Sequence, residues 1–484
     1  MNVCDFVFNK IKQYDDEIAL IDYSTNETIK FSEIESKTEA IATNLFERGI
    51  KKGDVVTIIA LNEPKYIIIV YAIIRLGAIV NSISSLSTED TMIQQLKESN
   101  TKLVLSNLDL SIPFDKVVHF NDLESDIKTL PDIDLNLDDE LLITWTSGTT
   151  GKSKGVVHTH KSMLAQYQMF IENKDNKIKD YMGQRHKDVV AGVIPMSNGF
   201  GLYVYAFGAI FHGACVVTLL KFDPEKFVNL LSEHKVTVVH AVPTIVNFLA
   251  KHPLVENVLP LTSLREIVSG GSPLSENLIS TVKKRLDVEL RQCYGLVETA
   301  CVSTPQYKDT STYSVGKILP GIQAAVRGPL GENDPPNSGE LYIRGPNVMK
   351  RWLNETENVY EQGFFRTGDV ITYEEDGTIT IIDRLKDIIK VKGYQVSPTE
   401  LENIIIDIEK VHDVAVIGVE DDQMGEVPKA FIVRNEESLT KHDVINFIKG
   451  KVESYKNIID VEFVDTIPKT ASGKILRSEL KKGV

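Results

Sequence analysis

The first 300 residues alternate between two spacings of hydrophobic positions. Short apolar runs at 102–106, 236–240 and 267–269 have the length and composition of buried strands. Residues 87–99 and 243–250 instead show helical spacing, and the first of these segments begins with side chains that commonly cap helices. Because strand-like and helix-like segments follow one another, the pattern predicts an α/β fold with mostly parallel sheets covered by helices.

The pattern changes after about residue 302. Short alternating runs at 340–344 and 378–382 are typical of strands that have one buried face. Turn sequences lie among them at 334–337 and at Asp376-Gly377, a dipeptide common in hairpins. We therefore predict a β-rich subdomain at about 303–385.

A third unit is predicted in the last hundred residues. It contains a helix-like segment at 398–409 and a strand-like segment at 414–419. Few apolar residues surround residues 383–387, as expected of a linker between domains. We place the boundary there, between a large N-terminal domain (1–385) and a small C-terminal domain (386–484).

One long stretch, from Val189 to Leu220, contains no Asp, Glu, Lys or Arg. It is long enough to span a bilayer. It also contains Pro195, His212 and five glycines, which do not suit a transmembrane helix. We interpret it as a buried strand, a turn at a functional site and a buried helix.

Length and charge narrow the classes of function. A chain of 484 residues is too long for one ordinary core, which predicts two or three domains. The net charge of −15 argues against a general binder of nucleic acid or membrane surfaces. The four cysteines show no CxxC spacing, and no secretory signal or S-K-L tail is visible, so we expect structural thiols and a cytoplasmic location. His158 and His160 lack companion ligands, so we expect a structural role for them and no zinc site.

A glycine-rich segment, Thr146 to Gly155, follows an apolar run at 141–145. Its glycines let backbone N–H groups approach a ligand closely, and its hydroxyls and lysines suit anionic oxygens, which indicates a phosphate-binding loop. A Walker loop is excluded, because two residues separate Gly148 from Gly151-Lys152 where that motif needs four. Two alternatives remain, since residues 151–155 match the G-x-S-x-G nucleophile elbow and a surface linker would share this composition.

Seven further motifs follow the loop. They are Gly270-Gly271-Ser272-Pro273, Tyr294-Gly295-Leu296-Val297-Glu298-Thr299, Gly339-Glu340-Leu341 with Arg344-Gly345-Pro346, Arg366-Thr367-Gly368-Asp369, Asp383-Arg384-Leu385-Lys386-Asp387, Lys392-Gly393-Tyr394-Gln395-Val396, and Pro468-Lys469-Thr470-Ala471-Ser472-Gly473-Lys474. Together with the loop, and in the same order, they resemble the motifs of adenylate-forming enzymes, which include acyl-CoA synthetases, coumarate-CoA ligases and beetle luciferases.

The resemblance covers nearly the whole chain. It implies a large domain of two α/β subdomains plus the β-rich subdomain, and a small mobile α+β C-terminal domain. It also implies a ligase that adenylates a carboxylic acid with ATP and Mg²⁺, then transfers the acyl group to coenzyme A and releases AMP and pyrophosphate. We expect a fatty or aryl acid, no nucleic-acid partner and no transmembrane segment, and the oligomeric state stays open.

The resemblance further implies roles for particular residues. ATP or AMP is expected to contact Thr146, Ser147, Gly148, Thr149, Thr150, Gly151, Lys154, Gly270, Gly271, Ser272, Tyr294, Gly295, Leu296, Asp369, Ile381 and Arg384. The expected catalytic residues are Lys474, Lys390 and Glu298, with Glu298 and Thr150 at the metal. The acyl pocket is expected to include Asn198, Gly199, Phe200 and Val242. Lys386 is the expected hinge, and Lys392 and Gly393 are expected on the side that meets CoA.

The chemistry explains why such residues are needed. A carboxylate attacks the α-phosphorus of ATP, and because both reactants are anions the difficulty is repulsion and positioning. Lys474, carried by a mobile tail, is expected to bridge the two anions. Asp369 is expected to accept hydrogen bonds from the ribose, Tyr294 to stack on adenine, and Glu298 to bind Mg²⁺, which takes few protein oxygens beside phosphate.

Two positions depart from the family pattern. Val297 stands where the family usually has Thr or Ser, so a hydroxyl that would contact the α-phosphate is missing, and we expect slower adenylation unless Thr299 or Thr150 compensates. Asn198 stands where many relatives have His, and an amide positions by hydrogen bonding but takes no proton.

Other functions remain open. The acyl group could pass to the pantetheine of a carrier protein, or the adenylate could be oxidised as in luciferases. A nucleotide-binding pseudoenzyme is a third alternative, because Val297 and Asn198 both depart from the family pattern.

Overall fold

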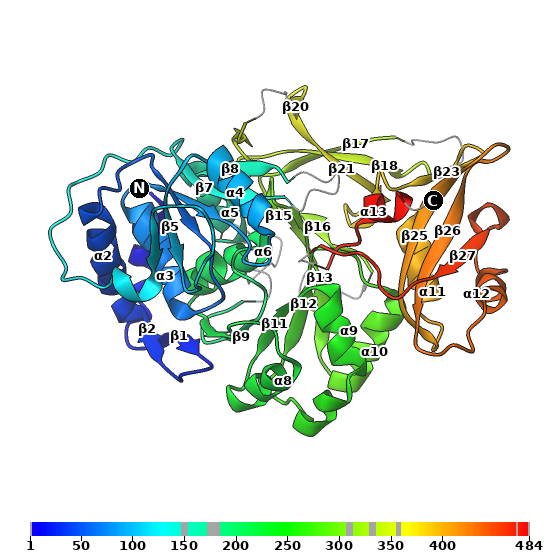
Figure 1. Cartoon of the computed structure of the whole chain (residues 1–484), viewed down its shortest axis with the longest axis horizontal. Helices are drawn as coiled ribbons and strands as arrows, with labels where there is room; N and C mark the ends of the chain where they lie inside the picture. Colours follow the sequence, from blue (N-terminus) through cyan, green and yellow to red (C-terminus); the bar gives the residue numbers. More distant parts are fainter. Residues whose placement is uncertain are drawn as a thin grey trace.

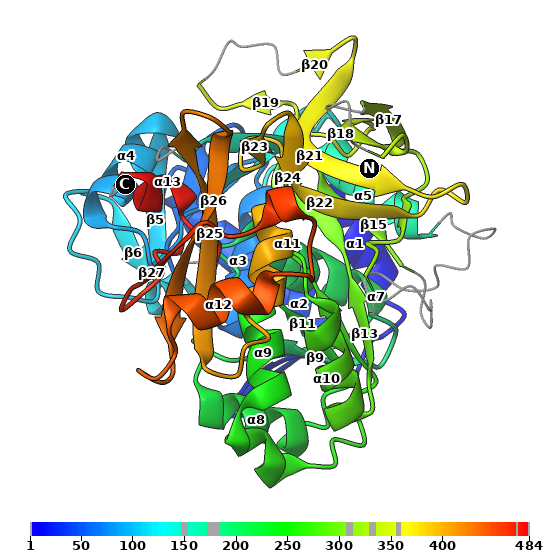
Figure 2. The ribbon, with the colours of Figure 1, turned by 90° about the vertical axis from the view of Figure 1, so that its right-hand side faces the viewer.

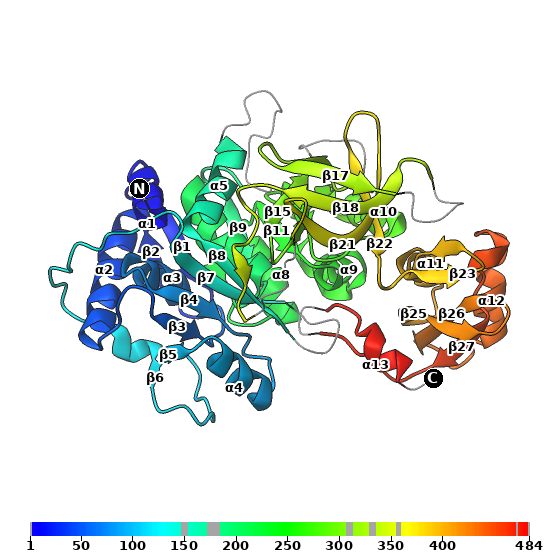
Figure 3. The ribbon, with the colours of Figure 1, turned by 90° about the horizontal axis from the view of Figure 1, so that it is seen from above.

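The computed structural model describes residues 2–146, 153–171, 184–305, 313–328, 335–354, 360–470 and 473–482. Within these ranges the chain forms a large body around two seven-stranded sheets, with a β-rich part above it and a smaller α+β unit at its side (Figure 1). Figure 3 shows the smaller unit standing beside the body, with the C-terminal helix close to the space between them. This is the class of fold that the sequence predicts.

The first sheet has the strand order β13-β12-β11-β9-β10-β1-β2, and its strands run parallel except where β2 pairs with β1. Its strands are β1 (Ile18–Asp22), β2 (Thr28–Lys30), β9 (Val189–Gly192), β10 (Cys215–Thr218), β11 (Val238–Ala241), β12 (Glu266–Ser269) and β13 (Glu289–Gln292). The carboxyl ends of parallel strands share one edge, where open α/β sheets bind ligands. Val242, Gly270 and Cys293 follow β11, β12 and β13 at this edge.

The second sheet has the order β19-β8-β7-β4-β3-β5-β6. Its strands are β3 (Val55–Ile58), β4 (Ile79–Ser82), β5 (Thr101–Ser106), β6 (Val117–His119), β7 (Glu140–Trp145), β8 (Gly155–Thr159) and β19 (Arg351–Trp352). Strands β7 and β8 pair antiparallel, so the glycine-rich segment connects the two strands of a hairpin.

Helices cover both sheets. They are α1 (Val3–Ile11), α2 (Phe31–Glu47), α3 (Pro64–Arg75), α4 (Glu89–Glu98), α5 (His160–Ile171), α8 (Pro224–Glu233), α9 (Pro243–Lys251) and α10 (Glu276–Leu286), with 3₁₀ turns η1 (Phe120–Leu123) and η3 (Pro253–Val258). Helix α3 contacts β1 of the first sheet and β4 of the second, and residues 66–74 are almost wholly buried. Its sequence is apolar all round because it packs on both sides.

The charge-free stretch forms β9, a helical segment and β10. The helical segment comprises α6 (Gly199–Gly201), a π-helical turn η2 (Leu202–Ala209) and α7 (Ile210–His212), and nearly all of it is buried. Gly213 ends it in the left-handed conformation, with φ of +73°. The prediction of a buried strand and helix is confirmed, and the helices in the described ranges lack the length and apolar character needed to cross a bilayer.

The β-rich part contains two smaller sheets. The first consists of β14 (Tyr294–Leu296), β15 (Ala300–Thr304) and β16 (Lys317–Ile318), and the second of β17 (Gln323–Arg327), β18 (Ser338–Arg344), β20 (Tyr360–Glu361), β21 (Phe364–Tyr373) and β22 (Ile379–Arg384). The predicted hairpin at Asp376-Gly377 joins β21 to β22, with Gly377 at φ +86°.

The small unit has its own sheet and core. Its elements are β23 (Ile389–Val391), β24 (Tyr394–Val396), α11 (Pro398–Ile405), β25 (Val411–Asp421), β26 (Gly425–Arg434), α12 (Lys441–Ile448), η4 (Ser454–Lys456), β27 (Asp460–Phe463) and α13 (Arg477–Lys481). One hydrophobic cluster runs from Ile389 to Val461. The domain boundary near residue 385 stays a prediction. Helix α11 ends at Ile405, so the expected helix to residue 409 was too long: turns at Ile408 and Val411 lead the chain into β25.

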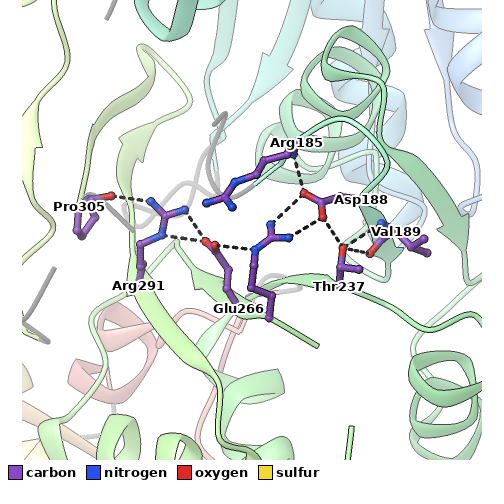
Figure 4. Close-up of polar contacts among 8 residues, drawn as sticks. Arg185, Asp188, Val189, Thr237, Glu266, Arg291 and Pro305 are labelled. Carbon is purple, nitrogen blue, oxygen red and sulfur yellow. Dashed lines mark hydrogen bonds and ion pairs between the residues drawn. The ribbon is translucent and has the colours of Figure 1, made fainter. Parts of the chain in front are cut away.

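A buried network of charges ties together the amino ends of the first sheet (Figure 4). Arg265 donates two hydrogen bonds to Asp188, at 2.7 and 2.9 Å. Arg291 binds Glu266, which begins β12, and donates to the Pro305 carbonyl at 2.7 Å. Because Asp188, Arg265 and Glu266 lie at the amino ends of β9 and β12, opposite Gly270, we interpret the network as structural.

Candidate active site

The glycine-rich segment starts and ends in the β7–β8 hairpin. Trp145 pairs with Gly155, and the backbone N–H of Thr146 donates to the Lys154 carbonyl at 3.0 Å. The nucleophile-elbow interpretation is wrong, because Ser153 precedes a strand where an elbow serine must enter a helix. Of the expected nucleotide contacts, Ser147, Gly148, Thr149, Thr150 and Gly151 lie outside the described residues.

Two glycines at the carboxyl end of β12 let neighbouring side chains pack close to the backbone. The N–H of Gly270 donates to the Ala241 carbonyl at 3.0 Å, and Gly271 has φ of +92°, a left-handed conformation that suits glycine. A Cβ at Gly270 would lie 2.9 Å from Cys293 Sγ and 3.2 Å from the ring of Phe200. Gly270 therefore faces Phe200 and Cys293, and Ser272 lies exposed beside it.

Asp369, in β21, holds two partners from different strands. Its Oδ1 lies 2.6 Å from Arg384 Nε, since Asp369 and Arg384 are paired across β21 and β22. Its Oδ2 accepts the hydroxyl of Tyr294 at 2.5 Å. Burial raises the pKa of Asp369, and the Arg384 guanidinium opposes this shift. The structure thus brings together three expected ATP contacts, and it gives Tyr294 a polar contact that the expectation of stacking did not include.

Lys474 reaches this cluster from the small unit. The charges of Asp369, Glu298 and Arg384 act on its ammonium, and burial, together with the Arg384 charge, lowers its pKa. Burial raises the pKa of Glu298, and Arg384 and Lys474 oppose that shift. Residues from β21, β22, the turn after β14 and the C-terminal tail therefore converge at one place.

Gly473, beside Lys474, lies against the large body. A Cβ at Gly473 would lie 3.5 Å from a side-chain methyl carbon of Thr244, near the start of α9. The tail that carries the lysine therefore packs at the same edge of the first sheet as Val242.

Two buried side chains hold the backbone carbonyl of Val297 in place. Its carbonyl accepts from His158 Nε2 at 2.8 Å and from the Tyr203 hydroxyl at 3.4 Å. Burial lowers the pKa of His158 to about 4, so the ring is neutral at pH 7. Thr299 is fully buried, and its Oγ1 donates to the Ala300 carbonyl at 3.2 Å.

His158 and His160, expected from the sequence to be structural, contact different partners. His158 binds the Val297 carbonyl, and His160 Nδ1 accepts the N–H of Val3 at 3.3 Å. In the parts of the chain that the structure describes, no three His, Cys, Asp or Glu side chains form a group that could hold a metal ion.

The expected acyl-pocket residues lie close to one another. Asn198 caps α6, since its Oδ1 accepts the N–H of Phe200 at 3.0 Å, so its amide positions the helix that bears Gly199 and Phe200. Val242 lies 3.9 Å from the Cβ position of Gly271. Sequence reasoning missed Cys293, although its position directly after β13 marks it as a residue of this edge.

The remaining expected contacts lie around the site or on the small unit. Gly295 and Leu296 lie in β14, and Ile381 lies in β22, packed against the main core. Lys386 lies in the segment between β22 and β23, and burial lowers its pKa. Lys390 is exposed on β23, and Lys392 and Gly393 form the tight turn between β23 and β24, with φ of +49° and +84°. The hydrogen bonds and ion pair given for Asp369, Tyr294 and Arg384 do not include residues of the β23–β24 hairpin.

Comparison with known proteins gives one consistent result. Residues 7–353 match the family model of the AMP-binding enzyme, and residues 400–474 match that of the AMP-binding enzyme C-terminal domain. The 4-coumarate–CoA ligase 1 of Solanum tuberosum is 33% identical over 512 residues, which cover 98% of this chain and 92% of that protein.

Two solved structures share the fold. ATP-bound MatB from Rhodopseudomonas palustris superposes with a TM-score of 0.88 and 24% identity, over 100% of this chain and 99% of that one. O-succinylbenzoate coenzyme A synthetase (MenE) from Bacillus subtilis, in complex with ATP and magnesium ion, gives a TM-score of 0.85 and 24% identity, over 98% and 99%. The family match over most of the chain and the curated relative over nearly all of it show that this chain belongs to the adenylate-forming, AMP-binding enzyme family.

Proposed function

We propose that this chain is an AMP-forming acid–CoA ligase. In the first step a carboxylate oxygen attacks the α-phosphorus of ATP and pyrophosphate leaves. In the second step the sulfur of CoA attacks the acyl carbon and AMP leaves with the electrons of the broken bond. Membership of the family and the relative named as a CoA ligase support this assignment.

The observation that carries the proposal is the position of Lys474. The tail of the small unit packs against Thr244 of the large body at Gly473, and the next residue, Lys474, carries an ammonium that is influenced by the charges of Asp369, Glu298 and Arg384. An ammonium that is partly withdrawn from water and faces a nucleotide site can offset the repulsion between carboxylate and α-phosphate. At 4 Å and an effective dielectric constant of about 20, one such pair of charges is worth about 4 kcal/mol.

Asp369, Arg384 and Glu298 are proposed to bind different parts of the substrates. Asp369 presents buried carboxylate oxygens for ribose hydroxyls, and Arg384 opposes the rise in the pKa of that carboxylate that burial causes. Glu298 fits Mg²⁺, because its carboxylate is partly buried at the same site and Mg²⁺ needs one or two protein carboxylates beside phosphate oxygens. The metal, when bound, would neutralise phosphate charge. Thr150 stays a proposed second ligand.

The side chains expected to contact the acyl group favour an apolar acid. Phe200, Val242 and Cys293 are uncharged, and they lie around the glycines that follow β12. An apolar wall suits a fatty or aryl group, which a ligand pocket holds mainly by hydrophobic contact. The name of the Solanum tuberosum relative, which refers to 4-coumarate, supports the aryl alternative.

The second step is proposed to follow a rotation of the small unit. The boundary would lie at residues 385–386, with Lys386 as the hinge. Rotation would withdraw Lys474 and bring the exposed hairpin of Lys390, Lys392 and Gly393 toward the adenylate and the thiol. Such opening and closing is common in enzymes that run two steps at one site.

A screen for pyrophosphate release tests the proposal. The full-length protein is mixed with ATP, Mg²⁺ and a series of fatty and aryl acids, with or without CoA. We expect pyrophosphate that depends on the acid, and AMP turnover that also requires CoA. ATP binding without pyrophosphate from any acid would instead support a pseudoenzyme. Turnover with a holo-carrier protein, or oxygen uptake, in place of CoA dependence would support the other two alternatives.

A further inference from the structure

A buried ion pair joins the tail that carries Lys474 to the small unit. Arg477 lies three residues beyond Lys474, at the start of α13. One of its terminal nitrogens lies 2.7 Å from Oε1 and 2.8 Å from Oε2 of Glu402, in α11. The two side chains are only 13% and 11% exposed. A charge-assisted contact of this kind, shielded from water, fixes the relative position of its partners.

The same pair also binds β25. Arg477 Nε donates to the Val416 carbonyl at 3.2 Å, and Glu402 Oε1 accepts the Val416 N–H at 2.8 Å. Leu480 of α13 adds an apolar contact to the cluster that contains Phe431. The Arg477–Glu402 pair therefore joins the tail, α11 and β25 at Val416.

Helix α11 is in turn anchored to the large body. Asp383, near the end of β22, accepts the Ser397 hydroxyl at 2.6 Å and the Thr399 N–H at 3.0 Å. Both donors belong to the first residues of α11 or its cap. Figure 2 shows α11 between β25 of the small unit and β22 of the body, and both pairs of elements are in contact. A continuous path thus leads from β22 through α11 to Arg477.

Local hydrogen bonds fold the tail around Lys474 into a turn. The N–H of Thr470 donates to the Lys474 carbonyl at 2.8 Å, and the N–H of Lys474 donates to Thr470 Oγ1 at 3.1 Å. These bonds shape a turn but do not attach it to a domain. Lys469 attaches one side of the turn by its contact with Asp413, at 2.6 Å, and Arg477 attaches the other side.

We propose that Glu402 and Arg477 are positioning residues for the adenylation step, which hold Lys474 at the distance and angle that the reaction needs. The inference rests on the proposed function. It adds two residues that touch neither ATP nor acid and act only through Lys474. Displacement of a catalytic group by about 1 Å can lower a rate by about 100-fold, so such support matters.

Two single variants and a matched control test the pair. Arg477→Lys keeps the charge but loses the planar fork, and Glu402→Gln keeps the acceptor for Val416 but removes the charge. Glu400→Gln makes the same change on the same helix, at a residue that binds Lys456 at 2.9 Å and not the tail. Pyrophosphate release is measured in a single turnover, and thioester formation is measured separately from synthetic acyl-adenylate and CoA.

The inference predicts an unequal effect on the two steps. Arg477→Lys and Glu402→Gln should lower pyrophosphate release at least about tenfold, while thioester formation and the KM for ATP stay within about threefold of wild type. Glu400→Gln should leave both steps within about threefold. Equal loss of both steps, or no loss in the first, would show that the pair is only structural and would overturn the inference.

Folding defects are separated by a second variant and a second control. If a single variant fails to fold, Glu402→Gln/Arg477→Met removes both charges together, which buried pairs tolerate better than loss of one partner. Glu266→Gln/Arg291→Met, in the network of Figure 4, disturbs a buried pair of the first sheet and should not separate the two steps. A wild-type protein without pyrophosphate release would instead refute the proposed function, and this inference with it.

Discussion

Replacement of Lys474 by methionine tests the electrostatic argument directly. Lys474→Met keeps a side chain of similar length and removes an ammonium whose charge interacts with Asp369 and Glu298. One charge pair at 4 Å, at an effective dielectric constant of about 20, is worth about 4 kcal/mol. That energy corresponds to about three factors of ten in rate. Because Arg384 stays at the site and retains part of the positive potential, we expect adenylation to fall by about 100- to 1000-fold.

The same variant should not lose stability. Burial and the neighbouring cation Arg384 lower the pKa of Lys474, as does Lys386, so the free protein holds this ammonium at an energetic cost. The measurements are single-turnover pyrophosphate release, thioester formation from supplied acyl-adenylate, and thermal unfolding. Lys482→Met removes an exposed lysine of the same tail and serves as the control. Unchanged pyrophosphate release in Lys474→Met, or an equal loss in the control, would refute the reasoning.

Three further predictions concern the residues around this lysine. Tyr294→Phe removes the hydroxyl that binds Asp369 and should lower the free energy of unfolding by about 1.5–3 kcal/mol in the absence of nucleotide. The KM for ATP should rise much less in Tyr294→Phe than in Tyr294→Leu, because only the second variant loses the ring. Equal KM values in the two variants would contradict stacking of the ring on adenine. Val297→Thr restores the hydroxyl of the family pattern and should speed pyrophosphate release by about tenfold if the new hydroxyl reaches the phosphate, and an unchanged single-turnover rate would show that it does not. The pKa of His158 is about 4 when folded and 6.5 when unfolded, so its contribution to stability is present above about pH 6.5 and is lost as the pH falls toward 4. Denaturant unfolding at about pH 7 and pH 5 should therefore show about 2 kcal/mol less loss in His158→Gln than in wild type, whereas the exposed control His442→Gln should behave like wild type.

The sequence predicts local elements well where a single segment contains the whole signal. The capping residues before α4 and the apolar runs of β5, β11 and β12 are each read from a few neighbouring positions, and the structure has these elements. The end of α11 was misplaced, because the apolar pattern continues to Ile408 although the chain must turn to enter β25 at Val411. Helical spacing alone does not reveal where tertiary contacts stop a helix.

The candidate site could be predicted in part for a similar reason. Asp369, Arg384 and Lys474 each lie in a motif, so the resemblance finds them, and the structure brings them together with Glu298. The contact between Glu402 and Arg477 joins residues 75 positions apart in the chain, and nothing local marks either one. Cys293 was missed because its proximity to Gly270 comes from the pairing of β12 with β13.

The pairing of Asp369 with Tyr294 and Arg384 affects how the protein would recognise a nucleoside. A sugar that approaches this carboxylate finds both oxygens already engaged, so it must share them or replace a partner. Exchange of one hydrogen bond for another changes the free energy little, commonly by about 0.5–1.5 kcal/mol. The sugar would then determine mainly how the nucleotide is oriented, and tight retention would have to come from the phosphate end.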